Sequence, residues 1–113
     1  MTRVFVYGTL KRGGENHHWI EAQRFVGPAR TRPVYRMFDL GGYPGLVRHP
    51  QGVSIEGELW DVDPAGLARL DVLEDVAGGE YERVPVELEG GEQAEGYLYL
   101  REVSGCRDCG TCW

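Results

Sequence analysis

The chain of 113 residues lacks the features of several protein classes. It has no run of about 18 apolar residues, which a transmembrane helix needs. Its beginning, Met1–Tyr7, lacks the layout of a signal peptide and reads as a strand instead. Its three cysteines all lie within the last eight residues, so the rest of the chain cannot depend on disulfides as small secreted folds do. From these absences we expect a cytoplasmic protein.

Positive charge is scarce as well. Twelve basic residues stand against 18 acidic ones, giving a formal net charge of -6, whereas a nucleic-acid-binding domain of this size normally carries a basic face. Only one of the bases is a lysine, Lys11, so Schiff-base chemistry would have to use a residue among loop-type neighbours. We therefore expect a small-molecule ligand rather than a nucleic acid or a membrane. Nothing in the pattern indicates an obligate interface, so we expect a monomer.

Apolar residues make up 42% of the chain and recur along most of it, which fits one domain with one core. We place this domain at residues 1–104 and treat residues 105–113 as a C-terminal tail. Cys106, Cys109 and Cys112 in the tail have the C-x2-C-x2-C spacing of zinc or iron–sulfur ligands, but no fourth ligand is evident. We therefore predict no metal, no cofactor and a flexible tail.

The hydrophobic pattern predicts an α+β fold with about five strands and two short helices. The strands are expected at residues 4–7, 33–40, 53–62, 80–89 and 94–103. One helix is expected at residues 17–26, because Gly27-Pro28 would end it. The other is expected at residues 64–75, because Asp63 can serve as N-cap with Pro64 at the first helical position. Residues 8–16 and 41–45 are glycine-rich loops or turns by composition.

The first candidate site follows the first strand, at Tyr7-Gly8-Thr9-Leu10. A strand that stops at glycine can turn its next backbone N–H groups outward, where they bind a carboxylate or an oxyanion without a cationic side chain. Gly8 would let a ligand approach the backbone closely. The alternative is a plain strand end, in which the glycine serves only the turn.

The second candidate is Glu74, which shares one face of the second predicted helix with Leu67 and Leu70 at i, i+3, i+7 spacing. Burial at the end of an apolar stripe raises the pKa of a carboxyl, which suits a general acid or base near neutral pH. Asp71 and Asp75 fall on a more polar row, as solvated charges do. If the helix ended before Glu74, this residue would be an ordinary surface glutamate.

Three segments carry a resemblance when they are taken together. They are Val6-Tyr7-Gly8-Thr9-Leu10-Lys11-Arg12-Gly13 with Asn16 following, Gly42-Tyr43-Pro44-Gly45, and Leu70-Asp71-Val72-Leu73-Glu74 followed by Tyr81-Glu82-Arg83. In this order they resemble the γ-glutamylcyclotransferase-like superfamily, in particular its AIG2-like and γ-glutamylamine cyclotransferase branch. The resemblance covers roughly residues 3–103 and leaves out the cysteine tail. It departs from many relatives at Asp75, where they have glycine.

The resemblance implies a compact mixed β-barrel with flanking helices, in which the loop Tyr7–Leu10 binds the glutamyl part of a substrate and Glu74 is the catalytic acid and base. The implied reaction cyclises a γ-glutamyl amide to 5-oxoproline and releases an amine, with no metal or cofactor. Two alternatives stay open. One is removal of a γ-glutamyl protecting group from a biosynthetic intermediate, and the other is a non-catalytic module that binds a small ligand. The leaving amine is not encoded in any visible motif.

Overall fold

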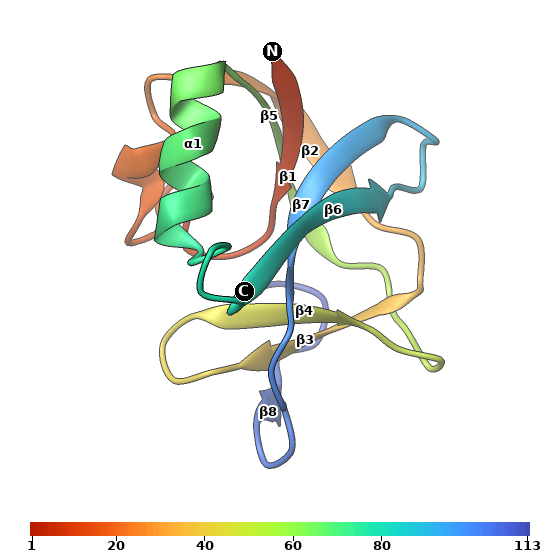
Figure 1. Cartoon of the computed structure of the whole chain (residues 1–113). Helices are drawn as coiled ribbons and strands as arrows, with labels where there is room; N and C mark the ends of the chain where they lie inside the picture. Colours follow the sequence, from red (N-terminus) through yellow and green to blue (C-terminus); the bar gives the residue numbers. More distant parts are fainter.

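Eight β-strands form one curled sheet, a half-barrel, and a single α-helix lies on one side of it (Figure 1). The computed structural model describes all 113 residues. Along the sheet the order is β2-β5-β1-β7-β4-β3-β8, and β6 pairs with β7 off this path. The elements are β1 (Thr2–Val6), β2 (Arg24–Arg30), β3 (Tyr35–Asp39), β4 (Pro44–Arg48), β5 (Glu56–Val62), α1 (Pro64–Leu73), β6 (Tyr81–Glu87), β7 (Gln93–Tyr99) and β8 (Arg107–Asp108).

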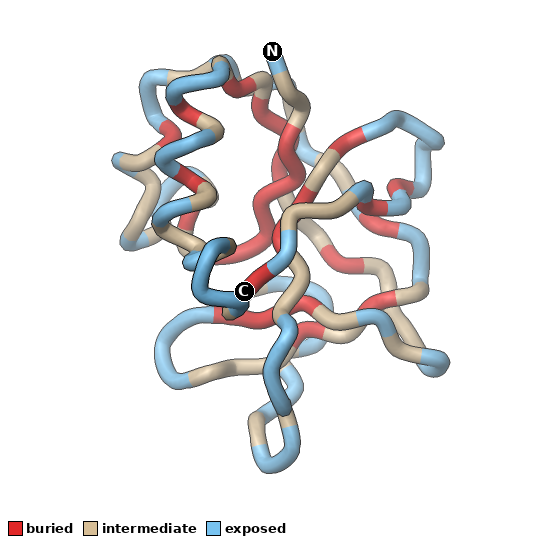
Figure 2. Tube along the Cα trace, viewed as in Figure 1, coloured by how far each residue is buried: buried red, intermediate tan, exposed pale blue.

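β1 is an interior strand of the sheet, antiparallel to β5 and parallel to β7. Its β-branched and aromatic side chains alternate between the two faces, as the period of a strand requires. Phe5 belongs to a core cluster with Met37 and Leu46, whereas Val4 belongs to a second cluster with Leu70. Buried positions therefore run along β1 (Figure 2). The glycine-rich loop begins where β1 ends, in the interior of the half-barrel.

The second predicted helix is present as α1. The Asp63 carboxylate accepts a hydrogen bond from the Gly66 N–H at 2.6 Å, and Pro64 is the first helical residue. The helix ends at Leu73, two residues earlier than predicted, with Glu74 as its C-cap. Asp75 then adopts φ +52, a left-handed conformation that no other non-glycine residue in the chain has. Glycine tolerates this conformation best.

The first predicted helix is wrong. Only one turn of 3-10 helix, η1 (His17–Trp19), forms there, and the chain then extends into β2. Gly27 and Pro28 lie inside this strand, where a register shift marks a bulge between Phe25 and Gly27. β2 can hold a proline because it is an edge strand of the sheet. Gly27 and Pro28, which in the sequence indicate the end of a helix, therefore belong to an irregular edge strand of the sheet.

The turn predicted at residues 41–45 is shorter than expected, because Pro44 and Gly45 already belong to β4. Gly41 and Gly42 have positive φ angles, and the Asp39 carboxylate accepts hydrogen bonds from both of their N–H groups. The alternating segments late in the chain are strands as predicted, β5, β6 and β7. None of the helices is long and apolar enough to cross a bilayer.

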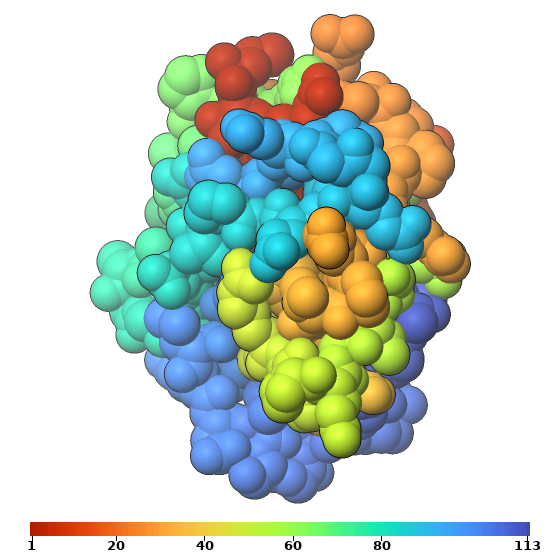
Figure 3. All heavy atoms as spheres, turned by 90° about the vertical axis from the view of Figure 1, so that its right-hand side faces the viewer, coloured from red at the N-terminus to blue at the C-terminus, as the bar shows by residue number.

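The C-terminal tail lies against the body of the protein. β8 pairs with the end of β3, and the Glu56 N–H donates to the Thr111 carbonyl at 2.7 Å. Trp113 packs against the core cluster that contains Phe5. In the space-filling view, the blue C-terminal residues lie directly beside the yellow and lime segment that contains β4 (Figure 3). No three side chains of His, Cys, Asp or Glu come together as a metal site would need.

Candidate active site

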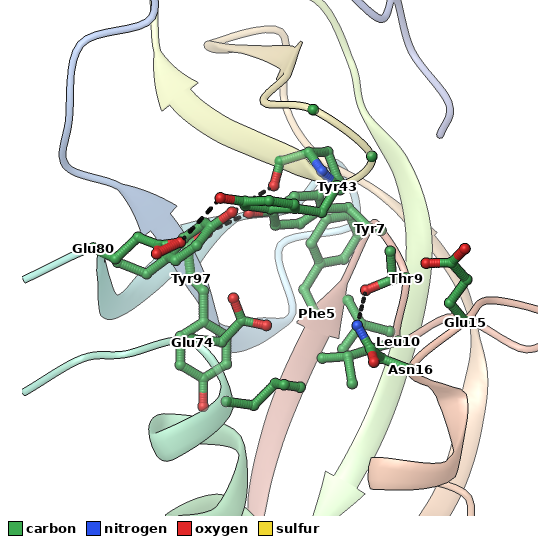
Figure 4. A pocket seen from close by; sticks show the side chains of 17 residues that line it. Phe5, Tyr7, Thr9, Leu10, Glu15, Asn16, Tyr43, Glu74, Glu80 and Tyr97 are labelled. Atoms are coloured by element: carbon green, nitrogen blue, oxygen red, sulfur yellow. Dashed lines mark hydrogen bonds between the residues drawn. The ribbon is translucent and has the colours of Figure 1, made fainter. Parts of the chain in front are cut away.

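A cavity of about 360 Å³ opens where the end of β1, the turn before β4 and the end of α1 meet (Figure 4). Its lining includes every residue that the sequence singled out for the site. These residues are Tyr7, Gly8, Thr9, Leu10 and Glu74. The structure therefore brings together two segments that lie in different halves of the sequence.

The loop after β1 folds back on itself and leaves backbone donors without acceptors. The Thr9 carbonyl accepts from the Asn16 N–H, and the Asn16 side-chain amide donates to Thr9 Oγ1, both at 3.0 Å. The N–H groups of Gly8, Thr9 and Leu10 make no hydrogen bond within the chain. Adjacent free N–H groups in a turn can bind an anion. These three residues all line the cavity.

Gly8 is required by packing as well as by the turn. A Cβ atom at Gly8 would lie 2.5 Å from Pro44 Cγ and 2.9 Å from Pro44 Cδ. The Pro44 carbonyl in turn accepts a hydrogen bond from the Tyr81 hydroxyl at 2.7 Å. The loop therefore sits directly on the start of β4, which the sequence did not indicate. The close approach that glycine permits here is to Pro44.

Glu58 anchors the same loop, although it lies on the opposite face of its strand from Ile55 and Leu59. It is buried and accepts hydrogen bonds from the Arg12 N–H at 3.1 Å, from Arg12 Nε at 3.1 Å and from Trp60 Nε1 at 3.2 Å. Burial alone would raise the pKa of Glu58, but these hydrogen bonds outweigh it and hold the pKa below its ordinary value. Both faces of β5 are covered, which alternation cannot reveal.

Glu74 enters the cavity from the end of α1. The helix does end before this residue, yet Glu74 is half-buried because the C-cap directs its side chain inward. Burial, and secondly the charge of Glu80, raise the pKa of Glu74 to about 7. Its carboxyl group takes part in none of the side-chain hydrogen bonds or ion pairs of the protein, and no dashed line reaches it in Figure 4. At neutral pH it can therefore both accept and donate a proton.

Three tyrosines fix the walls of the cavity through their hydroxyl groups. Tyr7 donates to the Tyr97 carbonyl at 2.6 Å, Tyr81 donates to the Pro44 carbonyl, and Tyr97 donates to Asp71 Oδ1 at 2.8 Å. Burial raises the pKa of all three phenols, so they remain protonated donors. Because each hydroxyl is already engaged, Glu74 is the group in this part of the wall that is free to exchange a proton.

Asp71 is not the solvated charge that its row on the helix predicts. Besides Tyr97, it binds Arg83, whose Nε lies 2.9 Å from Oδ1, and Arg83 also pairs with Glu95. This network ties α1 to β6 and β7, next to Glu74. Asp71 and Arg83 are twelve residues apart, and nothing in the sequence indicates that they are in contact. The Leu70–Glu74 and Tyr81–Arg83 segments are therefore one unit in three dimensions.

The comparisons with known proteins point to one family. A family model described as "Gamma-glutamyl cyclotransferase, AIG2-like" matches residues 4–111, so the match extends into the tail. A Vibrio cholerae protein named "Putative gamma-glutamylcyclotransferase" is 48% identical over 84 residues, 74% of this chain and 70% of its own length. The γ-glutamylcyclotransferase family protein YtfP of Escherichia coli K12 is 37% identical over 93% of this chain and 88% of its own length. The crystal structure of c4763, a uropathogenic E. coli-specific protein, superposes with a TM-score of 0.85 at 26% identity, over 99% of this chain and 91% of that one.

Proposed function

The chain belongs to the family of AIG2-like γ-glutamyl cyclotransferases, and we propose that it converts a γ-glutamyl amide into 5-oxoproline and a free amine. One observation carries the proposal. A single cavity contains both a loop with unbonded backbone N–H groups and Glu74, whose pKa is raised to about 7. A carboxylate-bearing substrate that must lose and regain protons needs both features.

The loop after β1 is the binding element of the proposal. The N–H groups of Gly8, Thr9 and Leu10 hold the α-carboxylate of the glutamyl group or the oxyanion that develops on its γ-carbonyl. No lysine, arginine or histidine lines the cavity, so backbone donors are the available partners for an anion. Hydrogen bonds that involve Glu58 and Asn16 hold the loop in its conformation.

Glu74 moves the protons. The substrate nitrogen begins as an ammonium group with three hydrogens and ends as a lactam N–H, while the leaving nitrogen ends as an ammonium group. Two protons therefore pass from one nitrogen to the other. The Glu74 carboxylate takes the first proton from the ammonium, the neutral amine attacks the γ-carbonyl, and the Glu74 carboxylic acid gives this proton to the leaving nitrogen as the amide C–N bond breaks. The attacking nitrogen loses its second proton to the regenerated Glu74 carboxylate, which passes it to the released amine to complete the ammonium group. Holding the folded conformer brings the nitrogen to the carbonyl, which supplies the proximity effect.

The experiment is a screen of γ-glutamyl amides with 5-oxoproline as the readout. The purified protein should release 5-oxoproline together with an equimolar amount of amine, and Glu74→Gln should not. Absence of 5-oxoproline from every amide would overturn the proposal and leave the binding-module interpretation. Deprotection of a biosynthetic intermediate uses the same chemistry and differs only in the amine.

We also propose that the protein is a monomer and that it acts in the cytoplasm without a metal or cofactor. Size-exclusion chromatography, localisation of the tagged protein, and activity after dialysis against a chelator test these three parts separately.

A further inference from the structure

The charge in the cavity is of one sign. Three of its lining residues are carboxylates, Glu15, Glu74 and Glu80, and none is a lysine, arginine or histidine. None of the three takes part in any of the eight ion pairs of the protein. A cavity that holds unpaired carboxylates attracts cations and repels anions. The backbone N–H groups of the loop can bind the single carboxylate of a glutamyl group. No comparable group of donors lines the end of the cavity away from the loop.

The carboxylates are distributed across the cavity. In the view of Figure 4, Glu74 lies between Thr9 and Glu15 on the loop side and Glu80 on the opposite side, and the Tyr43 hydroxyl reaches toward Glu80. If the glutamyl carboxylate is on the loop and the reacting amide is at Glu74, the leaving amine extends toward Glu80 and Tyr43.

Glu80 and Tyr43 face each other across this end of the cavity. The Tyr43 hydroxyl donates to Glu80 Oε1 at 3.4 Å, and Tyr43 as a residue is 40% exposed. The cationic residue that affects the Tyr43 hydroxyl electrostatically is Arg101. Arg101 is exposed and does not line the cavity. A carboxylate beside an accessible aromatic ring is a combination that binds ammonium groups, through a charge-assisted hydrogen bond and the face of the ring.

We propose that Glu80 and Tyr43 form a subsite for the leaving amine, and that the preferred substrates are γ-glutamyl amides whose amine carries a second positive charge and no carboxylate. This inference rests on the proposed function, since it assigns one end of that reaction's substrate. A terminal ammonium contacts Glu80 and lies on the Tyr43 ring. A leaving group that ends in a carboxylate meets Glu80 with like charge.

The experiment compares three amides of equal reach that differ only in terminal charge. They are the mono-γ-glutamyl amide of 1,4-diaminobutane, γ-glutamyl n-pentylamide, and the γ-glutamyl amide of 4-aminobutanoate. We expect kcat/KM to be highest for the first and lowest for the third, with about a tenfold preference for the cationic over the neutral amide. Added salt should reduce this preference, because it screens exposed charges.

Glu80→Gln is the decisive variant, and the ratio of kcat/KM for the cationic and neutral amides is the quantity to follow. Removal of the Glu80 charge also changes the proton affinity of Glu74, but that effect acts on both amides and cancels in the ratio. The ratio should fall about tenfold. Glu82→Gln is the matched control, because Glu82 lies two residues further along the chain, in β6, is exposed and does not line the cavity. It should leave the ratio unchanged.

The outcomes separate this inference from the proposed function. If wild-type protein converts the neutral or the anionic amide as well as the cationic one, in a reaction that Glu74→Gln abolishes, the cyclotransferase function stands and the amine subsite is refuted. A tenfold preference that survives Glu80→Gln refutes it as well. If no amide yields 5-oxoproline, both proposals fail together.

Discussion

At the residue scale, the reaction that we propose for the cavity depends on one carboxyl group, that of Glu74. Glu74→Gln keeps the shape and the hydrogen-bonding capacity of the side chain but cannot accept a proton from the substrate ammonium. We expect kcat to fall by about 10²–10⁴-fold, the usual contribution of general acid–base catalysis. Binding of a γ-glutamyl ligand should persist, because the loop N–H groups are unchanged. Steady-state kinetics and calorimetric titration measure the two quantities.

Asp75→Asn is the control for this substitution, because it neutralises the neighbouring carboxyl, which is exposed and does not line the cavity. It should change kcat far less. Wild-type turnover by Glu74→Gln, or loss of turnover in Asp75→Asn, would show that the acid–base residue has been misassigned.

The raised pKa of Glu74 also predicts how stability depends on pH. Its pKa rises from the ordinary 4.5 to about 7 on folding, so across this window the folded protein holds a proton that the unfolded chain has lost. The stabilisation from this group is complete below the unfolded pKa and is lost as pH rises through the folded pKa. Glu74→Gln cannot titrate. The free energy of unfolding of the variant minus that of wild type should therefore increase across the window and level off above it.

Urea denaturation of both proteins at several pH values measures this difference, and other titrating groups cancel in the subtraction. A difference that does not change with pH would mean that Glu74 is solvated in the folded protein.

Sequence reasoning did not find the distant partners of the charged residues that support the site. Glu58 and Arg12 are 46 residues apart, and Asp71 meets Arg83 across two elements. Helical or strand periodicity places a side chain on a face of its own element but does not show whether another element covers that face. Glu74 could be predicted because an apolar stripe leads to it and because the resemblance agrees. Glu80 and Tyr43 have no such stripe.

At the scale of elements, the strongest local signals gave correct predictions. Asp63 with Pro64 predicts the start of α1, and clean alternation predicts β5, β6 and β7. β2 and β4 were missed because each contains both a proline and a glycine, which favour turns in an isolated sequence. Their strand conformation depends on pairing with β5 and β3, respectively, and such pairing is a tertiary property.

The packing of the loop on β4 gives a prediction for Gly8. A methyl group at this position would overlap the ring of Pro44, so Gly8→Ala should destabilise the protein by about 1–3 kcal/mol, as overpacking does. The double variant Gly8→Ala/Pro44→Ala removes the Cγ and Cδ atoms that the new methyl meets. It should recover part of the lost stability and of the 5-oxoproline release.

A double-mutant cycle from urea denaturation tests this coupling. If the effects of Gly8→Ala and Pro44→Ala simply add, the glycine is not required by contact with Pro44. Turnover by Gly8→Ala at the wild-type rate would separately argue against the loop as the binding element.

The end of α1 gives a prediction for Asp75. This residue holds a left-handed conformation at φ +52, and its carboxylate forms no hydrogen bond. Asp75→Gly should therefore raise the free energy of unfolding by about 0.5–1 kcal/mol.

Ala77→Gly is the control, because Ala77 is exposed in the same turn segment and does not have positive φ. It should be neutral or destabilising. Equal losses of stability in the two glycine variants would refute the strain at Asp75.

At the scale of the whole molecule, the site is assembled by the sheet topology. β1 and β7 pair in parallel although they lie near opposite ends of the chain, and this pairing brings the loop after β1 next to Tyr97 and the end of α1. The α+β class follows from the sequence pattern, and the barrel-like curvature follows from the family resemblance. The pairing order follows from neither, because local periodicity carries no information about which distant strands meet.

The tail is the part of the whole molecule for which sequence and structure lead to different expectations. Its composition predicts a flexible appendage, whereas in the structure Cys109 and Trp113 pack against the core and β8 extends the sheet. The Trp113 carbonyl also accepts a hydrogen bond at 3.2 Å from Lys11, which belongs to the loop of the candidate site. Contacts of this kind stabilise both the domain and the loop.

Deletion of residues 105–113 should therefore lower the thermal midpoint, by about 4–8 °C for each 1 kcal/mol lost, and should raise KM for a γ-glutamyl amide because the loop loses its contact with the tail. Trp113→Ala removes the indole alone and should cause much of the thermal shift. Lys11→Ala should raise KM with a smaller effect on stability, since its partner is a surface contact. Differential scanning calorimetry and 5-oxoproline kinetics measure these effects. If the deleted protein keeps the wild-type midpoint and KM, the tail is the flexible appendage that its composition predicts, and the domain is complete at residue 104.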